Sequence, residues 1–145
     1  DKVALLQQVP LFREVKPEGL TPLANAARLT VYPGGTWVVE QGARREEAQD
    51  GDSLYLIVEG RVRVVREVGD REETLATLGP GEFFGEMALL DGRPRSATVI
   101  TEEDTQCLIL SRWDLMRAMR RDPEIAIQML TVMSERLRSM QDMVA

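Results

Sequence analysis

The 145-residue sequence contains no histidine and a single cysteine, Cys107. Zinc, copper and non-haem iron sites are built mostly from histidine and cysteine ligands, so the chain lacks the residues for them. The absence of histidine also removes the side chain that most often transfers protons near neutral pH. One cysteine forms no disulfide within the chain, and a lone thiol in an apolar segment fits a buried side chain in a reducing compartment. We therefore expect a cytoplasmic protein that binds no metal and is not an enzyme.

Basic side chains are outnumbered, and long apolar runs are missing. Eighteen Lys and Arg against 24 Asp and Glu give a formal net charge of −6 at pH 7. The field of such a chain repels polyanions such as DNA, so a bound anion needs a local site. No run approaches the ~20 apolar residues of a membrane-spanning helix, and the N-terminus lacks a secretory signal. Length and hydrophobic content predict one globular domain over residues 1–145.

Three sections follow one another along this domain. Residues 1–29 carry helical patterns, and Thr21-Pro22 predicts a helix N-cap followed by proline at the first helical position. Residues 30–110 contain short β-type runs broken by glycine and proline, with a solvated loop at 43–52. Seven or eight strands at this spacing predict an antiparallel sandwich, jelly roll or barrel, so the fold is mainly β with flanking helices. The clearest runs are 29–32, 36–39, 53–58, 61–66, 74–78, 97–100 and 107–110.

Residues 111–145 return to a helical period. Ser111 with Asp114 resembles a capping box, and Asp122-Pro123 starts a long helix that reaches about Val144. Two apolar stripes run along this helix, and one can pack on the domain while the other meets a second copy. A homodimer through the helix is expected; the alternative is one broad face buried on the chain's own core. The expected dimer seam is Leu130, Met133, Leu137, Met140 and Val144, and the neighbouring stripe is Ile125, Met129 and Val132.

The segment 83–99 carries the most specific chemistry. Gly85 permits a tight turn before a short helix at 86–90, whose free backbone N–H groups can hold an anion. Arg95 and Ser96 add a planar fork of donors and a hydroxyl, which completes a phosphate site. Glu86 beside a phosphate makes sense when the ligand also carries hydroxyl donors, as a ribose does. These residues therefore indicate a nucleotide with a monoanionic phosphodiester.

Two stretches, Phe84-Gly85-Glu86-Met87-Ala88-Leu89-Leu90 and Arg95-Ser96-Ala97-Thr98-Val99, resemble the phosphate-binding cassette of cyclic nucleotide-binding domains. The arrangement is most similar to the sensor domain of bacterial transcription regulators of the catabolite activator protein type. The resemblance spans nearly the whole chain, places the cassette at 84–98, and implies an eight-stranded β-roll with a long C-terminal dimerisation helix.

The resemblance also implies roles for individual residues. Arg95 pairs with the cyclic phosphate, assisted by Ser96, and Glu86 accepts the ribose 2′-hydroxyl together with the Gly85 backbone. Arg136, on the long helix, reaches Glu86 and ties that helix to the ligand. The backbone amides that complete the cradle belong to Met87, Ala88 and Ala97. The residues near the base are Val64, Leu75, Ser139 and Met140.

The resemblance leaves the ligand and the output open. Cyclic AMP is expected ahead of cyclic GMP, although Met140 and Gln141 stand where the best-known relative has a hydroxyl pair that reads adenine. DNA binding would belong to a helix-turn-helix module missing from this chain, which is either a truncated regulator or a complete protein with a separate partner. A regulatory module of a channel or kinase, or a dimerisation module without ligand, would fit the same residues. A jelly-roll enzyme of the cupin kind would need the absent histidines.

Overall fold

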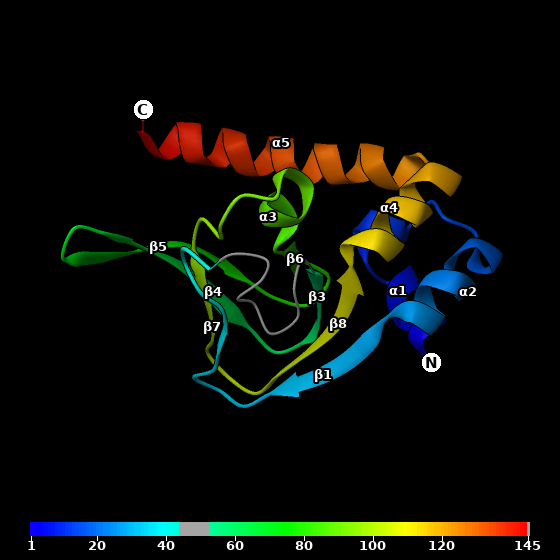
Figure 1. The fold of residues 1–145 in the computed structure, drawn as a ribbon, viewed down its shortest axis with the longest axis horizontal. Helices are drawn as coiled ribbons and strands as arrows, with labels where there is room; N and C mark the ends of the chain where they lie inside the picture. Colours follow the sequence, from blue (N-terminus) through cyan, green and yellow to red (C-terminus); the bar gives the residue numbers. More distant parts are fainter. Residues whose placement is uncertain (44–52, 145) are drawn as a thin grey trace.

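The computed structural model of the chain describes residues 1–43 and 53–144 (Figure 1). Short helices come first, strands follow, and two helices end the described part, so the predicted order of elements is confirmed. The helices are α1 (Lys2–Gln7), the 3₁₀ helix η1 (Pro10–Phe12), α2 (Pro17–Ala26), α3 (Glu86–Asp91), α4 (Arg112–Arg121) and α5 (Glu124–Val144). The strands are β1 (Arg28–Tyr32), β2 (Trp37–Val39), β3 (Ser53–Glu59), β4 (Val62–Val68), β5 (Arg71–Leu78), β6 (Phe83–Phe84), β7 (Thr98–Thr101) and β8 (Thr105–Ser111). All but Ala43 of the loop predicted at 43–52 lies outside the described residues.

The described strands form two four-stranded sheets, and every recorded pair of strands is antiparallel. One sheet has the order β1-β8-β3-β6 and the other β2-β7-β4-β5. Apart from the β4–β5 hairpin, the neighbours in each sheet are not consecutive in the chain, which is the topology of a roll rather than a meander. The predicted mainly β fold with flanking helices is therefore confirmed.

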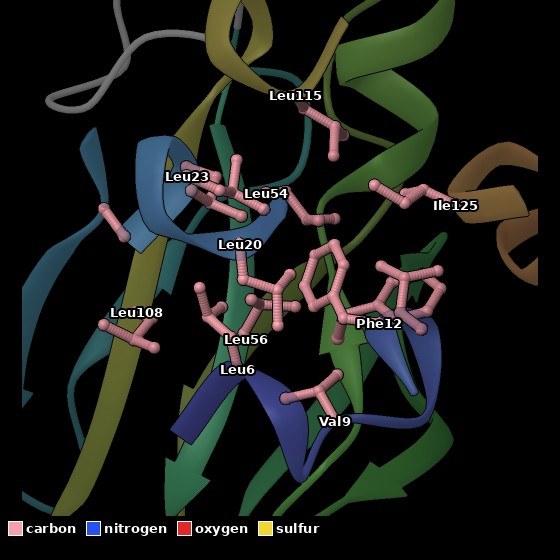
Figure 2. Packing of buried hydrophobic residues seen from close by; sticks show 14 of the residues in the cluster. Leu6, Val9, Phe12, Leu20, Leu23, Leu54, Leu56, Leu108, Leu115 and Ile125 are labelled. Carbon is pink, nitrogen blue, oxygen red and sulfur yellow. The ribbon is translucent and has the colours of Figure 1, made fainter. Parts of the chain in front are cut away.

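Strands β3 and β8 lie between two hydrophobic cores. Leu54 and Leu56 face a core shared with the helices, whereas Tyr55 and Ile57 face the interior of the roll. This double burial explains why 53–58 is continuously apolar instead of alternating. The side chains of α1, η1, α2, α4 and α5 meet those of β3 and β8 in the first core, as Figure 2 shows for ten labelled residues. They are Leu6, Val9, Phe12, Leu20, Leu23, Leu54, Leu56, Leu108, Leu115 and Ile125.

The predicted helix start at Thr21-Pro22 is wrong. α2 begins five residues earlier, with Lys16 in an extended conformation (ψ 149°) and Pro17 as the first helical residue. Thr21 lies inside the helix, and its hydroxyl donates to the Pro17 carbonyl at 3.3 Å. Both sites offer proline a first-turn position, and the apolar contacts of Leu20 with the core select the earlier one.

The cap predicted at Ser111 is confirmed, because the Asp114 amide donates to the Ser111 hydroxyl at 3.2 Å. The next helix, α5, runs across the top of the molecule in Figure 1, beside α3 and α4. Its bounds, Glu124–Val144, agree with the prediction to within one residue. In the part of the chain that the structure describes, no helix combines the length and apolarity needed to cross a membrane.

The two stripes of α5 have different surroundings. Ile125 and Met129 are each only 2% exposed in the first core, with Val132 packed beside them, so the stripe predicted to face the domain does so. Met133 also packs partly against this core. Four large apolar side chains among those described on the helix point to solvent. They are Ile127 (52% exposed), Leu130 (65%), Leu137 (56%) and Met140 (53%).

One member of the dimer seam expected from the heptad spacing lies closer to the domain than the others. Met133 is half-buried and packs partly against the first core, whereas Leu130, Leu137 and Met140 are exposed. Ile127 is a further exposed apolar residue of α5. The side chain of Val144 lies outside the described part. Dimerisation itself stays a prediction.

Candidate functional site

The turn between β6 and α3 requires a glycine at position 85. Gly85 has a φ of +92°, a region that L side chains rarely adopt. A Cβ atom there would lie 2.8 Å from the Ser53 carbonyl oxygen and 2.9 Å from Nη1 of Arg95. Only glycine lets the chain pass this close to both groups before it enters α3.

Arg95 is held inside the protein against this turn and is only 6% exposed. Its Nη1 atom donates to the Gly85 carbonyl at 2.9 Å and its Nη2 atom to the Ser53 carbonyl at 3.5 Å. The Arg95 backbone is fixed as well, since its amide donates to Ala43 and its carbonyl accepts from Gly42. The Arg95 guanidinium thus lies against the Gly85 turn from which α3 starts.

The start of α3 adds hydrogen-bond donors to this cation. The Leu89 amide donates to the Gly85 carbonyl at 3.3 Å, and the amides of residues 86–88 precede it in the first turn, where no carbonyl one turn earlier is in reach. Ser96 is exposed next to Arg95, and Ala97 is half-buried. The side chain of Ala88 lies outside the described part. Backbone donors, a guanidinium and a hydroxyl together suit an anion such as a phosphate.

Glu86 is joined to α5 by an ion pair. Its Oε1 atom lies 2.9 Å from Nη1 of Arg136, and the two side chains are 11% and 30% exposed. Nη2 of Arg136 donates to the Phe83 carbonyl at 2.6 Å, and the guanidinium lies 4.6 Å from the centroid of the Phe83 ring. One arginine of α5 thus holds the end of β6 and the first residue of α3. The sequence predicts this contact with Glu86, whereas a role toward a ligand stays a prediction.

The residues predicted to surround a base lie on separate elements. Val64, on β4, packs partly against the core inside the roll, and Leu75, on β5, is half-buried. Ser139 and Met140 are exposed near the end of α5. The structure does not bring these four into one recorded contact, so their role as base contacts stays a prediction.

Three site residues escaped the sequence reasoning. Ser53 and Phe83 act through backbone carbonyls, and because every residue carries a carbonyl, no sequence signal reveals which one accepts from an arginine. Tyr55 stacks on Phe84 with centroids 4.8 Å apart and lies directly under the Gly85 turn. The aromatic pair Phe83-Phe84 before a glycine is the one sequence signal that could have indicated aromatic packing beneath the Gly85 turn.

A β-roll whose two sheets carry a glycine turn, a short helix and a buried arginine is the architecture of nucleotide-sensing domains with a phosphate cassette. Residues 30–122 match the family model described as the cyclic nucleotide-binding domain. The chain belongs to this family.

Individual proteins of this family are similar to the chain over most of its length. The cyclic AMP receptor protein of Thermus thermophilus is 40% identical over 130 residues, which are 89% of this chain and 57% of that protein. The crystal structure of the Thermus thermophilus catabolite activator protein superposes with a TM-score of 0.79 at 38% identity, over 93% of this chain and 61% of that one. A cAMP-dependent protein kinase regulatory subunit from Aspergillus fumigatus is 35% identical over 109 residues, 75% of this chain and 24% of the subunit. The chain thus spans less than two thirds of each of these proteins.

Proposed function

We propose that this chain is the sensor domain of a bacterial transcription regulator and that its ligand is cyclic AMP. The observation that carries the proposal is the juxtaposition of a phosphate cradle at Gly85 and Arg95 with the Glu86–Arg136 ion pair from α5. The relatives named for cyclic AMP, at 40% and 35% identity, favour this nucleotide over cyclic GMP. The domain reports a ligand and carries out no catalysis.

Each group at the site has a role in holding the nucleotide. Arg95 and the first-turn amides of α3, with Ser96 and the Ala97 amide, neutralise and orient the cyclic phosphate. The Glu86 carboxylate accepts a hydrogen bond from the ribose 2′-hydroxyl, since a carboxylate is an acceptor only. The backbone amides of Met87 and Ala88 complete the cradle around the phosphate. The base lies toward Val64, Leu75 and the exposed end of α5.

The ion pair connects occupancy of the site to the position of α5. A ribose hydroxyl that bonds to Glu86 competes with Arg136 for the same carboxylate, so binding changes the contact that holds α5 on α3. A ligand shifts such an equilibrium only by the difference in its affinity for the two positions of the helix. Contacts with Ser139 and Met140, which lie one turn beyond Arg136, supply that difference.

The exposed apolar stripe of α5 receives a second copy of the chain. Leu130 and Leu137 lie two turns apart and are both more than half exposed, the spacing that a coiled-coil seam requires. Leu137→Asp should shift the protein toward monomer in sedimentation equilibrium, with Arg138→Asp as the control on the same turn. DNA binding belongs to a helix-turn-helix module outside residues 1–145.

Isothermal titration calorimetry tests the ligand. We expect cyclic AMP to bind, and Arg95→Gln to weaken binding at least 100-fold because the phosphate loses its only buried cation within the described cradle. Arg93→Gln is the matched control, since Arg93 is exposed two residues away. Thermal unfolding checks that both variants fold.

The possible results separate the candidates. Tighter binding of cyclic GMP would overturn the ligand and keep the sensor. Flat titrations with both nucleotides would overturn the sensor and leave a dimerisation module. The relative from Aspergillus fumigatus makes a kinase regulatory module the second candidate; it predicts the same titrations but a monomer in sedimentation.

A further inference from the structure

The outward face of α4 carries a stripe of arginines beside an exposed tryptophan. Leu115 is fully buried in the first core, and Met116, Ala118 and Met119 pack around it, so these residues hold the helix on the domain. The opposite side carries Trp113, 64% exposed, followed at helical spacing by exposed Arg117, Arg120 and Arg121. We call these four residues the α4 stripe.

The α4 stripe has no acidic partner within the part of the chain that the structure describes. The exposed arginines of the β4–β5 hairpin behave differently, because Arg63, Arg66 and Arg71 each lie within 4 Å of a glutamate. The one recorded contact of the stripe is internal: the Arg117 guanidinium lies 5.9 Å from the centroid of the Trp113 ring. Among the described residues, three cations on one helix thus stand without a carboxylate in a chain of net charge −6.

A shallow groove beside the stripe separates α4 from α2. Arg117 and Arg121 line it on one side and Pro22 and Leu23 on the other, around a hollow of about 30 Å³. This volume accommodates part of one side chain and no nucleotide. Asp114 also lines the groove, but its carboxylate already accepts from the Ser111 hydroxyl at 2.8 Å. The groove therefore offers cationic and apolar walls to a protein surface.

We propose that the α4 stripe docks an acidic helical segment of a partner protein. Eight residues separate Trp113 from Arg121, which is about 12 Å along the helix, so carboxylates one turn apart on a second helix would meet successive arginines. Arginine binds a carboxylate through two parallel hydrogen bonds, and Trp and Arg are the residues that most often dominate binding energy at interfaces. An apolar side chain of the same segment would cover Trp113.

A protein segment fits the stripe better than a nucleic acid does. The overall charge of −6 opposes a long polyanion, whereas a short acidic helix feels mainly the three nearby arginines. The proposal does not rest on nucleotide binding, because the stripe lies on α4 and the cradle on β6 and α3. Arg112, on the side of α4 that faces the cradle, donates to the Leu89 carbonyl and is not part of the stripe.

Fluorescence anisotropy with a series of labelled helical 15-residue peptides tests the docking site. The peptides carry zero, one, two or three glutamates at helical spacing, with glutamine in the remaining positions and one leucine in line with them. We expect affinity to rise with each glutamate and to fall with added salt. Quenching or a spectral shift of Trp113 fluorescence should accompany binding, and Trp113→Ala should weaken binding at least tenfold.

Two triple variants that remove the same charge distinguish binding at the α4 stripe from non-specific electrostatic attraction. Arg117→Gln with Arg120→Gln and Arg121→Gln should weaken the three-glutamate peptide at least tenfold. Arg66→Gln with Arg71→Gln and Arg93→Gln removes the same charge from exposed positions elsewhere and should leave affinity within twofold. Equal losses in both variants, or no dependence on the glutamate count, would overturn the proposal. Tighter binding of a 20-base-pair DNA duplex or of anionic phosphatidylglycerol vesicles at this stripe would assign it to those partners instead.

Discussion

Replacing Arg136 by methionine should destabilise the protein through the junction of α5, β6 and α3. The substitution keeps an unbranched side chain of similar length and good helix propensity, so that it removes mainly the guanidinium. Three contacts disappear together: the ion pair with Glu86 at 2.9 Å, the hydrogen bond to the Phe83 carbonyl at 2.6 Å, and the contact with the Phe83 ring. Glu86, which is 8% exposed, then lies without its ion-pair partner.

The size of the effect follows from these contacts and their exposure. A hydrogen bond to a charged group contributes about 1.5–3 kcal/mol, and a cation over an aromatic ring about 0.5–1 kcal/mol at a partly exposed site. The terms overlap, and the 30% exposure of Arg136 screens the pair, so the sum is an upper bound. We expect the free energy of unfolding to fall by about 2 kcal/mol, part of it from the stranded Glu86 carboxylate.

Urea denaturation without nucleotide measures this loss of stability, and a double-mutant cycle shows how much of it comes from the interaction of Glu86 with Arg136. Glu86→Gln alone should lower the free energy of unfolding by about 1 kcal/mol, and the double variant should lose about 1 kcal/mol less than the sum of the two single variants. Arg138→Met is the control, because Arg138 is exposed on the same turn and should stay within about 0.5 kcal/mol of the parent. Single effects that add to within about 0.3 kcal/mol would refute the coupling of Glu86 and Arg136.

Two further perturbations test the roll. Gly60 has a φ of +99°, and a Cβ there would lie 2.5 Å from the Thr105 hydroxyl oxygen, whereas Gly69 (φ +67°) has nothing within 4 Å. Gly60→Ala should lower the free energy of unfolding by at least about 3 kcal/mol and Gly69→Ala by about 1 kcal/mol; similar losses in urea would contradict the steric reasoning. Burial raises the pKa of the Cys107 thiol from 9.0 to about 12, so the folded state keeps a proton that the unfolded chain has released. The free energy of unfolding should therefore fall as pH rises from about 9 to about 12, and equal pH slopes in urea for the parent and Cys107→Ala would exclude this cause.

The strands of the roll could be predicted because short apolar runs alternate with glycine and proline. The partners of those strands could not, since Leu54, Tyr55, Leu56 and Ile57 are all apolar and nothing local says which core each one faces. The start of α2 shows the same limit. The local signal favours Thr21-Pro22, because threonine is a good N-cap residue and Lys16 makes no side-chain cap, yet the burial of Leu20 in the core places the start at Pro17.

At the site, the charged residues could be predicted and their backbone partners could not. Glu86, Arg95 and Arg136 stand in a sequence pattern that resembles a known cassette, and the structure brings them to one junction. The carbonyls of Ser53, Gly85 and Phe83 fix the two arginines, yet they depend on chain geometry alone. The partial burial of Met133 could not be predicted for a similar reason, because its contact with the first core depends on how α5 lies on the domain.

Because β3 and β8 are buried on both faces, a fragment of this chain that is to fold alone must keep the helices that cover them. Residues 30–122, the segment that matches the family model, leave out α1, η1, α2 and all of α5. Cutting there would uncover Leu54, Leu56 and Leu108 on the outer side of the sheet, which those helices now shield from water. The fragment 30–122 would then expose a large apolar surface, and we expect it to aggregate during expression. Fusions and biosensors made from this domain should therefore keep the N-terminal helices and be joined through the ends of the full 145 residues.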